Sequence, residues 1–178
     1  MAEWIIPERL FDGRDLHDGK ALRVEDGQVT AIGAAPTDGR RVAGIVAPGF
    51  IDLQVNGGGG VLLNTDPTPE AMEAIAAAHR RFGTWAILPT VITDAPEVLA
   101  AVVDAALEAK GRQGVIGLHI EGPHISVPRR GTHAPGFVRP MDDSTLDHVR
   151  RLRAADIAVM ITLAPEAAST DQITALAE

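Results

Sequence analysis

The residues best suited to do chemistry lie in the segment 117–125, which reads GLHIEGPHI. Side chains alternate along a strand, so His119 and Glu121 would share one face, opposite an apolar face that suits a layer of helices. The Gly-Pro pair that follows would end the strand at once. A carboxylate is thus expected at the C-terminal end of a buried strand, where α/β folds place their active sites. Taken alone, a glutamate at a strand end is more often a solvated residue than a ligand.

A second segment, FIDLQV at 50–55, shows the same alternation and would put Asp52, Gln54 and Asn56 on one face. The glycines at 57–60 allow the backbone to come close to a ligand, but the Lys-Ser/Thr of a phosphate-binding P-loop is missing. We therefore interpret them as a tight turn beside a ligand rather than a nucleotide site.

These side chains need a scaffold, and from residue 47 onward the sequence predicts one of alternating strands and helices. Strands are expected at 50–55, 85–92, 115–121 and 157–164, and helices at 69–83, 95–111, 142–154 and from 170. Asp94 is expected as the N-cap of the second helix, and either Asp142 or Asp143 as that of the third. Such alternation calls for parallel strands joined by crossover helices.

The segment 1–46 has a different pattern and is predicted to be β structure. Asp26-Gly27 lies between two apolar runs and is typical of a two-residue hairpin turn. We assign 1–46 to part of a small β-sandwich domain and 47–178 to four β/α units. Four units fit either an open four-stranded sheet or the first half of a (β/α)8 TIM-type barrel. We favour a truncated barrel, because the early β segment has no return partner later in the chain.

Composition limits the kinds of function. The chain of 178 residues has no cysteine, so any metal must be held by His, Asp or Glu. Its net charge of −8, without a Lys/Arg run, argues against nucleic acid or anionic membranes as partners. No signal peptide and no long apolar span are present, which predicts a cytoplasmic soluble protein.

Five motifs together resemble one family. They are APGFIDLQVNGGGG, LPTVIT, GLHIEGPHI, GTHAPGFVRP and ITLAPE, in that order across 47–166. This set resembles the N-terminal half of the N-acetylglucosamine-6-phosphate deacetylases of the amidohydrolase superfamily. The most specific part is HIEGP followed by GTH.

The resemblance implies roles for particular residues. Glu121 matches the family's carboxylate metal ligand, whereas Thr132 and His133 match residues that contact the substrate, with His133 near the acetamido carbonyl. Gln54 and Asn56 stand where many amidohydrolases have His-x-His, which resembles the branch with one metal, expected to be one Zn²⁺ per site. Gln54, Asn56 and His119 would help to position the residues that contact the metal and the substrate. His124 lies near the site in the sequence and is a weaker candidate for a functional role.

The implied function is a metal-dependent hydrolase that removes the acetyl group from N-acetylglucosamine 6-phosphate, a phosphorylated amino sugar, as a homodimer when full length. The family's two histidine ligands and its catalytic aspartate would lie beyond residue 178. Two alternatives remain: a non-catalytic truncated fragment, or another amidohydrolase acting on a cyclic amide. A half barrel would also expose an interior face with Asp52, Gln54, Thr90, His119 and Glu121.

Overall fold

The computed structural model describes residues 2–177. Contacts divide the chain into two compact units, one up to Gly49 and the other from Phe50 onward. The sequence pattern changes at residue 47, in the connection between β5 (Arg40–Val46) and β6 (Phe50–Val55).

The first unit is a mostly antiparallel sheet. Its strands are β1 (Ala2–Phe11), β2 (Leu16–Asp18), β3 (Lys20–Glu25), β4 (Gln28–Ala34) and β5, in the order β2-β1-β3-β4 with β5 parallel to β1. Asp26 and Gly27 have φ angles of 50° and 79°, as a two-residue turn between β3 and β4 requires. The predicted hairpin is confirmed.

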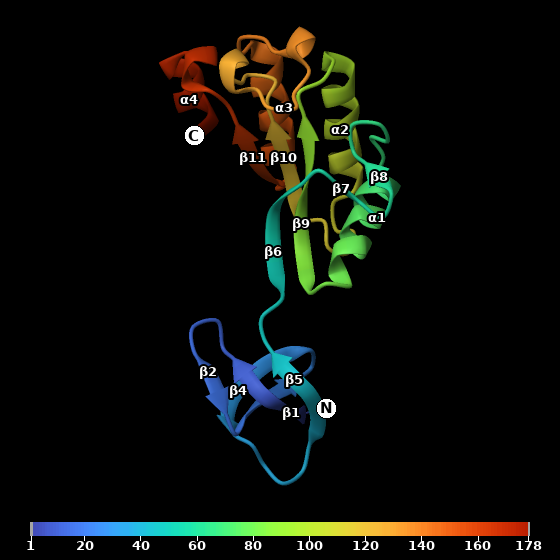
Figure 1. Ribbon diagram of the computed structural model, residues 1–178, viewed down its shortest axis with the longest axis vertical. Coiled ribbons are helices and arrows are strands. Elements are labelled where there is room, and N and C mark those ends of the chain that lie inside the picture. Colours follow the sequence, from blue (N-terminus) through green and yellow to red (C-terminus); the bar gives the residue numbers. More distant parts are fainter. Residues whose placement is uncertain (1, 178) are drawn as a thin grey trace. The chain divides into compact units, whose positions relative to one another are not determined.

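The second unit is a parallel sheet with strands in chain order. Strands β6, β9 (Thr84–Ile92), β10 (Gly117–Glu121) and β11 (Ala158–Thr162) lie in the order β11-β10-β9-β6. Each is followed by a helix, namely α1 (Pro69–Arg80), α2 (Pro96–Glu108), α3 (Asp143–Ala154) and α4 (Thr170–Ala177) (Figure 1). Unlike a doubly wound sheet, it has no reversal of strand order, so it is the β/α half-barrel that the sequence predicts.

Short elements decorate the loops of this unit. A small hairpin pairs β7 (Gly57–Gly58) with β8 (Val61–Leu62), and single 3-10 turns occur at Val127–Arg129, Pro135–Phe137 and Pro165–Ala167. The sequence did not predict these elements, which are too short to show a periodic pattern.

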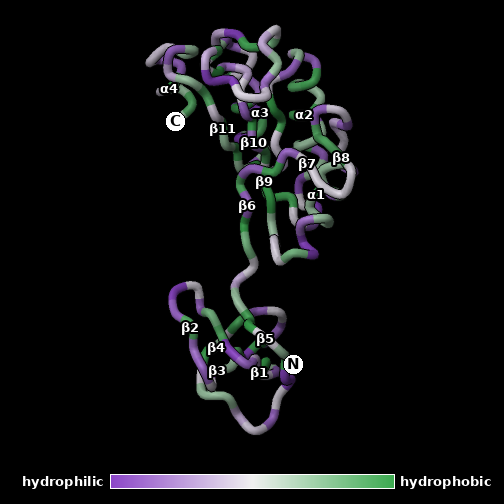
Figure 2. The backbone as a smooth tube through the Cα atoms, in the orientation of Figure 1, coloured by the Kyte–Doolittle hydropathy of each residue, from purple (hydrophilic) through white to green (hydrophobic). Residues whose placement is uncertain are grey.

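The helices cover one face of the parallel sheet. Leu118 and Ile120 of β10, together with Ile87 and Val91 of β9, belong to one buried apolar cluster, and β9 is coloured mostly hydrophobic along its length (Figure 2). The helices supply the other side of this cluster, with Met72 and Ile75 from α1, Val102 and Val103 from α2, and Leu152 from α3. Alternation then sends the polar residues of β10 to the opposite face.

Two expected helix caps are resolved by the structure. Asp94 is not the N-cap of α2, because Ala95 occupies that position and the Asp94 carboxylate instead accepts a hydrogen bond from Asn64 Nδ2 at 2.9 Å. Asp142 rather than Asp143 caps α3, because its Oδ1 accepts from the backbone N–H groups of Ser144 and Thr145. The role of Asp94 is thus set by a tertiary contact with Asn64, whereas the cap at Asp142 is set by the local backbone geometry.

In the part of the chain that the structure describes, no helix has the length and apolar character needed to cross a membrane.

The cap of α3 yields a prediction with a matched control. Asp142→Ala should lower the free energy of unfolding by about 1 kcal/mol, because two backbone donors lose their acceptor. Asp143→Ala removes a first-turn carboxylate without a capping bond and should cost only about 0.3 kcal/mol. Chemical denaturation of the full-length gene product measures both, and equal losses would contradict the assignment.

The loss of unfolding free energy expected for Asp142→Ala depends on pH. The hydrogen bond from Ser144 lowers the pKa of Asp142 below its ordinary value. A depressed folded-state pKa stabilises the fold above the unfolded-state pKa of about 3.9, and that stability is lost as the pH falls. The deficit of Asp142→Ala should therefore shrink as the pH falls below about 4.

Candidate active site

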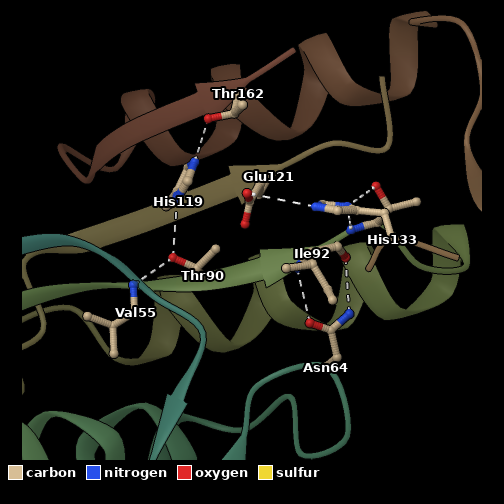
Figure 3. A network of polar contacts seen from close by, with 9 residues as sticks. Val55, Asn64, Thr90, Ile92, His119, Glu121, His133 and Thr162 are labelled. Carbon is tan, nitrogen blue, oxygen red and sulfur yellow. Dashed lines mark hydrogen bonds and ion pairs between the residues drawn. The ribbon is translucent and has the colours of Figure 1, made fainter. Parts of the chain in front are cut away.

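The polar face of the half-barrel gathers side chains at the C-terminal ends of its strands (Figure 3). Glu121 is the last residue of β10, Thr162 is the last of β11, and Thr93 directly follows β9. Because parallel strands end at one edge of a sheet, these three positions become neighbours although they are far apart in sequence.

His119 lies at the centre of a line of hydrogen bonds across the sheet. Its Nδ1 is 3.2 Å from Thr90 Oγ1 on β9, and its Nε2 is 2.9 Å from Thr162 Oγ1 on β11. Thr90 Oγ1 in turn accepts the backbone N–H of Val55 at 2.9 Å, which brings β6 into the line. Both ring nitrogens of His119 are thus engaged by threonines.

This line corrects the expectation of an exposed interior face. Thr90 and His119 are both fully buried, Asp52 and Glu121 are partly exposed, and only Gln54 is exposed. Burial lowers the pKa of His119, with the charge of Glu121 acting in the opposite direction. His119 therefore behaves as a neutral structural residue, packed between threonines rather than facing an empty interior.

Glu121 faces His133, a residue from the loop after β10. Oε1 of Glu121 is 3.7 Å from Nε2 of His133, and the two side chains are 18% and 11% exposed. Within residues 2–177, this is the polar contact of the Glu121 carboxylate, so most of its oxygen lone pairs remain available to a ligand.

His133 is held from its other side by Thr93. Nδ1 lies 2.8 Å from Thr93 Oγ1 and 3.4 Å from the Thr93 backbone nitrogen. Gly122 packs against the same hydroxyl, at a positive φ of 80° where an added Cβ would overlap Thr93 Oγ1. Thr93 is itself buried, so its position is fixed by both neighbours.

The other predicted site residues, Thr132, Gln54 and Asn56, make no hydrogen bond to Glu121, His133 or Thr93 among residues 2–177. Thr132 precedes His133 in the loop and is exposed, as are Gln54 and Asn56 at the end of β6. The Gln54 backbone N–H donates to Asp52 Oδ1 at 3.1 Å, so the Asp52 carboxylate is engaged in a local backbone hydrogen bond. These side chains are open to solvent, and among residues 2–177 none of them forms a hydrogen bond or ion pair with Glu121.

The remaining candidate histidine has a structural role. His124 is fully buried, with Nδ1 3.0 Å from the Arg139 carbonyl oxygen and Nε2 2.9 Å from Thr145 Oγ1. A carbonyl only accepts, so Nδ1 carries the proton and Nε2 accepts from the threonine. Burial lowers the pKa of His124. With both nitrogens engaged, it has no lone pair left for a metal.

Donors for a metal ion are few in this part of the chain. Among residues 2–177, no three His, Cys, Asp or Glu side chains lie close enough together to hold one. A catalytic zinc ion usually has three protein ligands. Glu121 has the donor chemistry of one such ligand, and the others would have to come from outside these residues.

Sequence reasoning missed three residues of this cluster. Thr93 and Thr162 bond to the two histidines, and Asn64 pairs with the backbone of Ile92, accepting its N–H at 3.1 Å and donating to its carbonyl at 3.0 Å. The available signal was positional, because Thr93 directly follows one predicted strand and Thr162 lies near the end of another. Asn64 gave no signal, since its partner lies 28 residues away.

The curated proteins similar to this chain include two bacterial deacetylases. N-acetylgalactosamine-6-phosphate deacetylase of Shewanella sp. strain ANA-3 is 48% identical over 138 residues, which is 75% of this chain and 34% of that protein. N-acetylglucosamine-6-phosphate deacetylase of Haemophilus influenzae is 34% identical over 120 residues, or 66% of this chain and 31% of that protein. The chain thus spans about a third of the length of these relatives. No family model matches it.

Solved structures show the same likeness. A variant of N-acetyl-D-glucosamine-6-phosphate deacetylase from Mycobacterium smegmatis, in complex with N-acetyl-D-glucosamine-6-phosphate, superposes with a TM-score of 0.80 at 29% identity, covering 93% of this chain and 44% of that one. The Pasteurella multocida enzyme gives a TM-score of 0.74 at 25% identity, covering 90% and 50%. Both the mostly antiparallel sheet and the half-barrel belong to the matched region.

The crowding around Gly122 predicts a large effect for a small change. Gly122→Ala and Gly111→Ala both place a side chain at positive φ, 80° and 84°, which costs about 1–2 kcal/mol. Gly111 has open space around it, whereas Gly122 abuts Thr93. Gly122→Ala should therefore destabilise by at least about 1 kcal/mol more. Denaturation midpoints measure the difference. Similar losses for the two variants would show that Thr93 can move aside without a loss of stability.

Proposed function

Because the chain belongs to the amino-sugar-6-phosphate deacetylase family, we propose that it forms part of a metal-dependent hydrolase that deacetylates N-acetylglucosamine 6-phosphate. The products are glucosamine 6-phosphate and acetate. The observation that carries the proposal is the pairing of Glu121, at the end of β10, with the imidazole of His133 at 3.7 Å. One can hold a metal ion and the other can donate to a carbonyl oxygen.

Glu121 is the proposed metal ligand of this part of the chain. Its carboxylate suits a divalent ion, for which we propose one Zn²⁺ per site. Such an ion would polarise the amide carbonyl and activate water. The other ligands and the catalytic aspartate would lie outside residues 2–177, so an isolated 178-residue chain should be a non-catalytic fragment.

His133 and Thr132 are the proposed substrate contacts. The Nε2 of His133 faces the same space as Glu121, where a donor would stabilise negative charge developing on the acetamido oxygen. Thr132 is exposed beside it and can hydrogen-bond the sugar.

Gln54, Asn56 and His119 are proposed to support the site. Gln54 near the end of β6 and Asn56 just beyond it carry amides, which are poor replacements for two imidazoles and so favour one metal rather than two. His119 holds the neighbouring strands in place through Thr90 and Thr162.

N-acetylgalactosamine 6-phosphate is a second candidate substrate. It is favoured by the 48% identity to the Shewanella protein, which exceeds the 34% identity to the Haemophilus protein. Both sugars carry the same acetamido and phosphate groups, so the roles proposed for Glu121 and His133 apply to either.

We also propose that the full-length enzyme works in the cytoplasm as a homodimer.

Acetate release from each sugar by the zinc-loaded, full-length gene product tests this function. His133→Ala should lower kcat by about 100-fold with little change in KM, because the lost donor acts on charge that develops in the transition state. His17→Ala is the control, since His17 lies in the first compact unit and bonds Asp12 at 2.8 Å. It should retain full activity.

The kinetic and metal-binding results distinguish between the possible roles of His133 and Glu121 and between the two substrates. A rise in KM with unchanged kcat would make His133 a binding residue only. Glu121→Gln should reduce zinc retention after dialysis, and an unchanged metal content would remove Glu121 from the ligand set. No acetate from either sugar would contradict the proposed function, whereas preference for one sugar decides between the two substrates.

A further inference from the structure

We propose that Thr93 is a positioning residue that holds His133 in the tautomer with the proton on Nε2, directed at Glu121 and the substrate carbonyl. This inference deepens the proposed function and rests on it for its kinetic consequence. The tautomer itself can be observed without catalysis.

Two groups of one residue converge on a single ring nitrogen. The backbone N–H of Thr93 and its hydroxyl oxygen lie 3.4 Å and 2.8 Å from Nδ1 of His133. A backbone N–H can only donate, so Nδ1 must present its lone pair to it. The hydroxyl can rotate, and it donates to the same lone pair.

The opposite side of the ring favours the same tautomer. With Nδ1 unprotonated, Nε2 carries the hydrogen and points it at Glu121 Oε1, 3.7 Å away. The alternative tautomer would set an N–H against the Thr93 N–H on one side and a lone pair against a carboxylate on the other. Both contacts are repulsive, so the two neighbours act together.

The surroundings leave this arrangement little freedom. Thr93 and His133 are both buried. The hydroxyl of Thr93 is confined by Gly122, where a Cβ would overlap it. The loop of His133 is closed on itself, because Arg130 accepts the His133 backbone N–H at 3.1 Å and donates Nη1–H to the His133 carbonyl at 3.1 Å.

The consequence for chemistry is a division of roles between the two side chains. Because Nδ1 is occupied and Nε2 bears a hydrogen, His133 has no lone pair to offer a metal ion, and it acts as a donor. The carboxylate of Glu121 remains the metal-binding group. Thr93 contacts His133 rather than Glu121, so it acts through His133.

Nitrogen-15 NMR of the full-length gene product tests the tautomer directly. At about pH 8.5, above the usual imidazole range, we expect the shifts of His133 to show an unprotonated Nδ1 and a protonated Nε2. A protonated Nδ1 would overturn the proposal, whether or not the protein deacetylates a sugar. Acetate release, measured separately, decides the proposed function.

Variants at Thr93 test its role. Thr93→Val keeps the shape and removes the hydroxyl but leaves the backbone N–H, so the preference of His133 for a proton on Nε2 should weaken rather than disappear, and kcat should fall by about 10- to 100-fold with little change in KM. Thr93→Ser should restore both. The matched control is Thr145→Val, which removes the buried threonine hydrogen bond to His124 and should change neither the His133 signature nor kcat.

The result that would overturn the role is a Thr93→Val variant with unchanged kcat and an unchanged His133 signature. If Thr93→Val does not fold, the wild-type spectrum and Thr93→Ser still decide. A serine variant that folds, keeps the wild-type tautomer and keeps kcat supports a hydroxyl role. A serine variant that loses kcat while the tautomer is unchanged contradicts it.

Discussion

The half-barrel depends on one line of buried hydrogen bonds that crosses its sheet. It runs from the Val55 N–H to Thr90 Oγ1 at 2.9 Å, on to His119 at 3.2 Å, and from His119 to Thr162 at 2.9 Å. Buried polar groups must find partners, and a strand that slipped by one residue would turn its polar side chain to the apolar face. The line therefore ties together the registers of β9, β10 and β11, and the Val55 N–H anchors β6 to them. Glu121 stands two residues beyond His119 on the same face, so its place at the sheet edge follows from this register.

Strand β10 combines packing and chemistry because its side chains alternate. Leu118 and Ile120 pack under the helices, whereas His119 and Glu121 face the polar side. At the end of the strand the backbone must turn while passing close to Thr93. Gly122 allows this turn because it adopts a positive φ and has no Cβ to overlap Thr93. A single short segment thus supplies core, register and a carboxylate, and the glycine that ends it keeps space for the threonine that contacts His133.

The histidines of the half-barrel are sorted by their hydrogen bonds rather than by their burial alone. His119 and His124 have both ring nitrogens engaged by protein groups, and His79 on α1 bonds the Gly57 carbonyl at 3.0 Å, holding the glycine-rich turn. His133 differs, because Nδ1 is held while Nε2 faces a carboxylate. Position in the network, more than residue type, distinguishes the proposed functional histidine from the structural ones.

The sequence by itself determined the features that depend on local periodicity and turn chemistry. These include the alternating faces of β10, the hairpin at Asp26-Gly27 and the carboxylate at a strand end, because a period of two and a pair of positive φ angles are properties of neighbouring residues. Strand β6 does not follow the expected alternation, because Ile51 and Leu53 are exposed while Asp52 is half-buried. Tertiary structure decided the burial of His119, the engagement of Asp94 by Asn64 and the contact between Thr93 and His133. The last pair is 40 residues apart, and its geometry arises only when parallel strands end at a common edge. A local pattern states which face a side chain takes, but the partner it meets there is set by how separate segments pack.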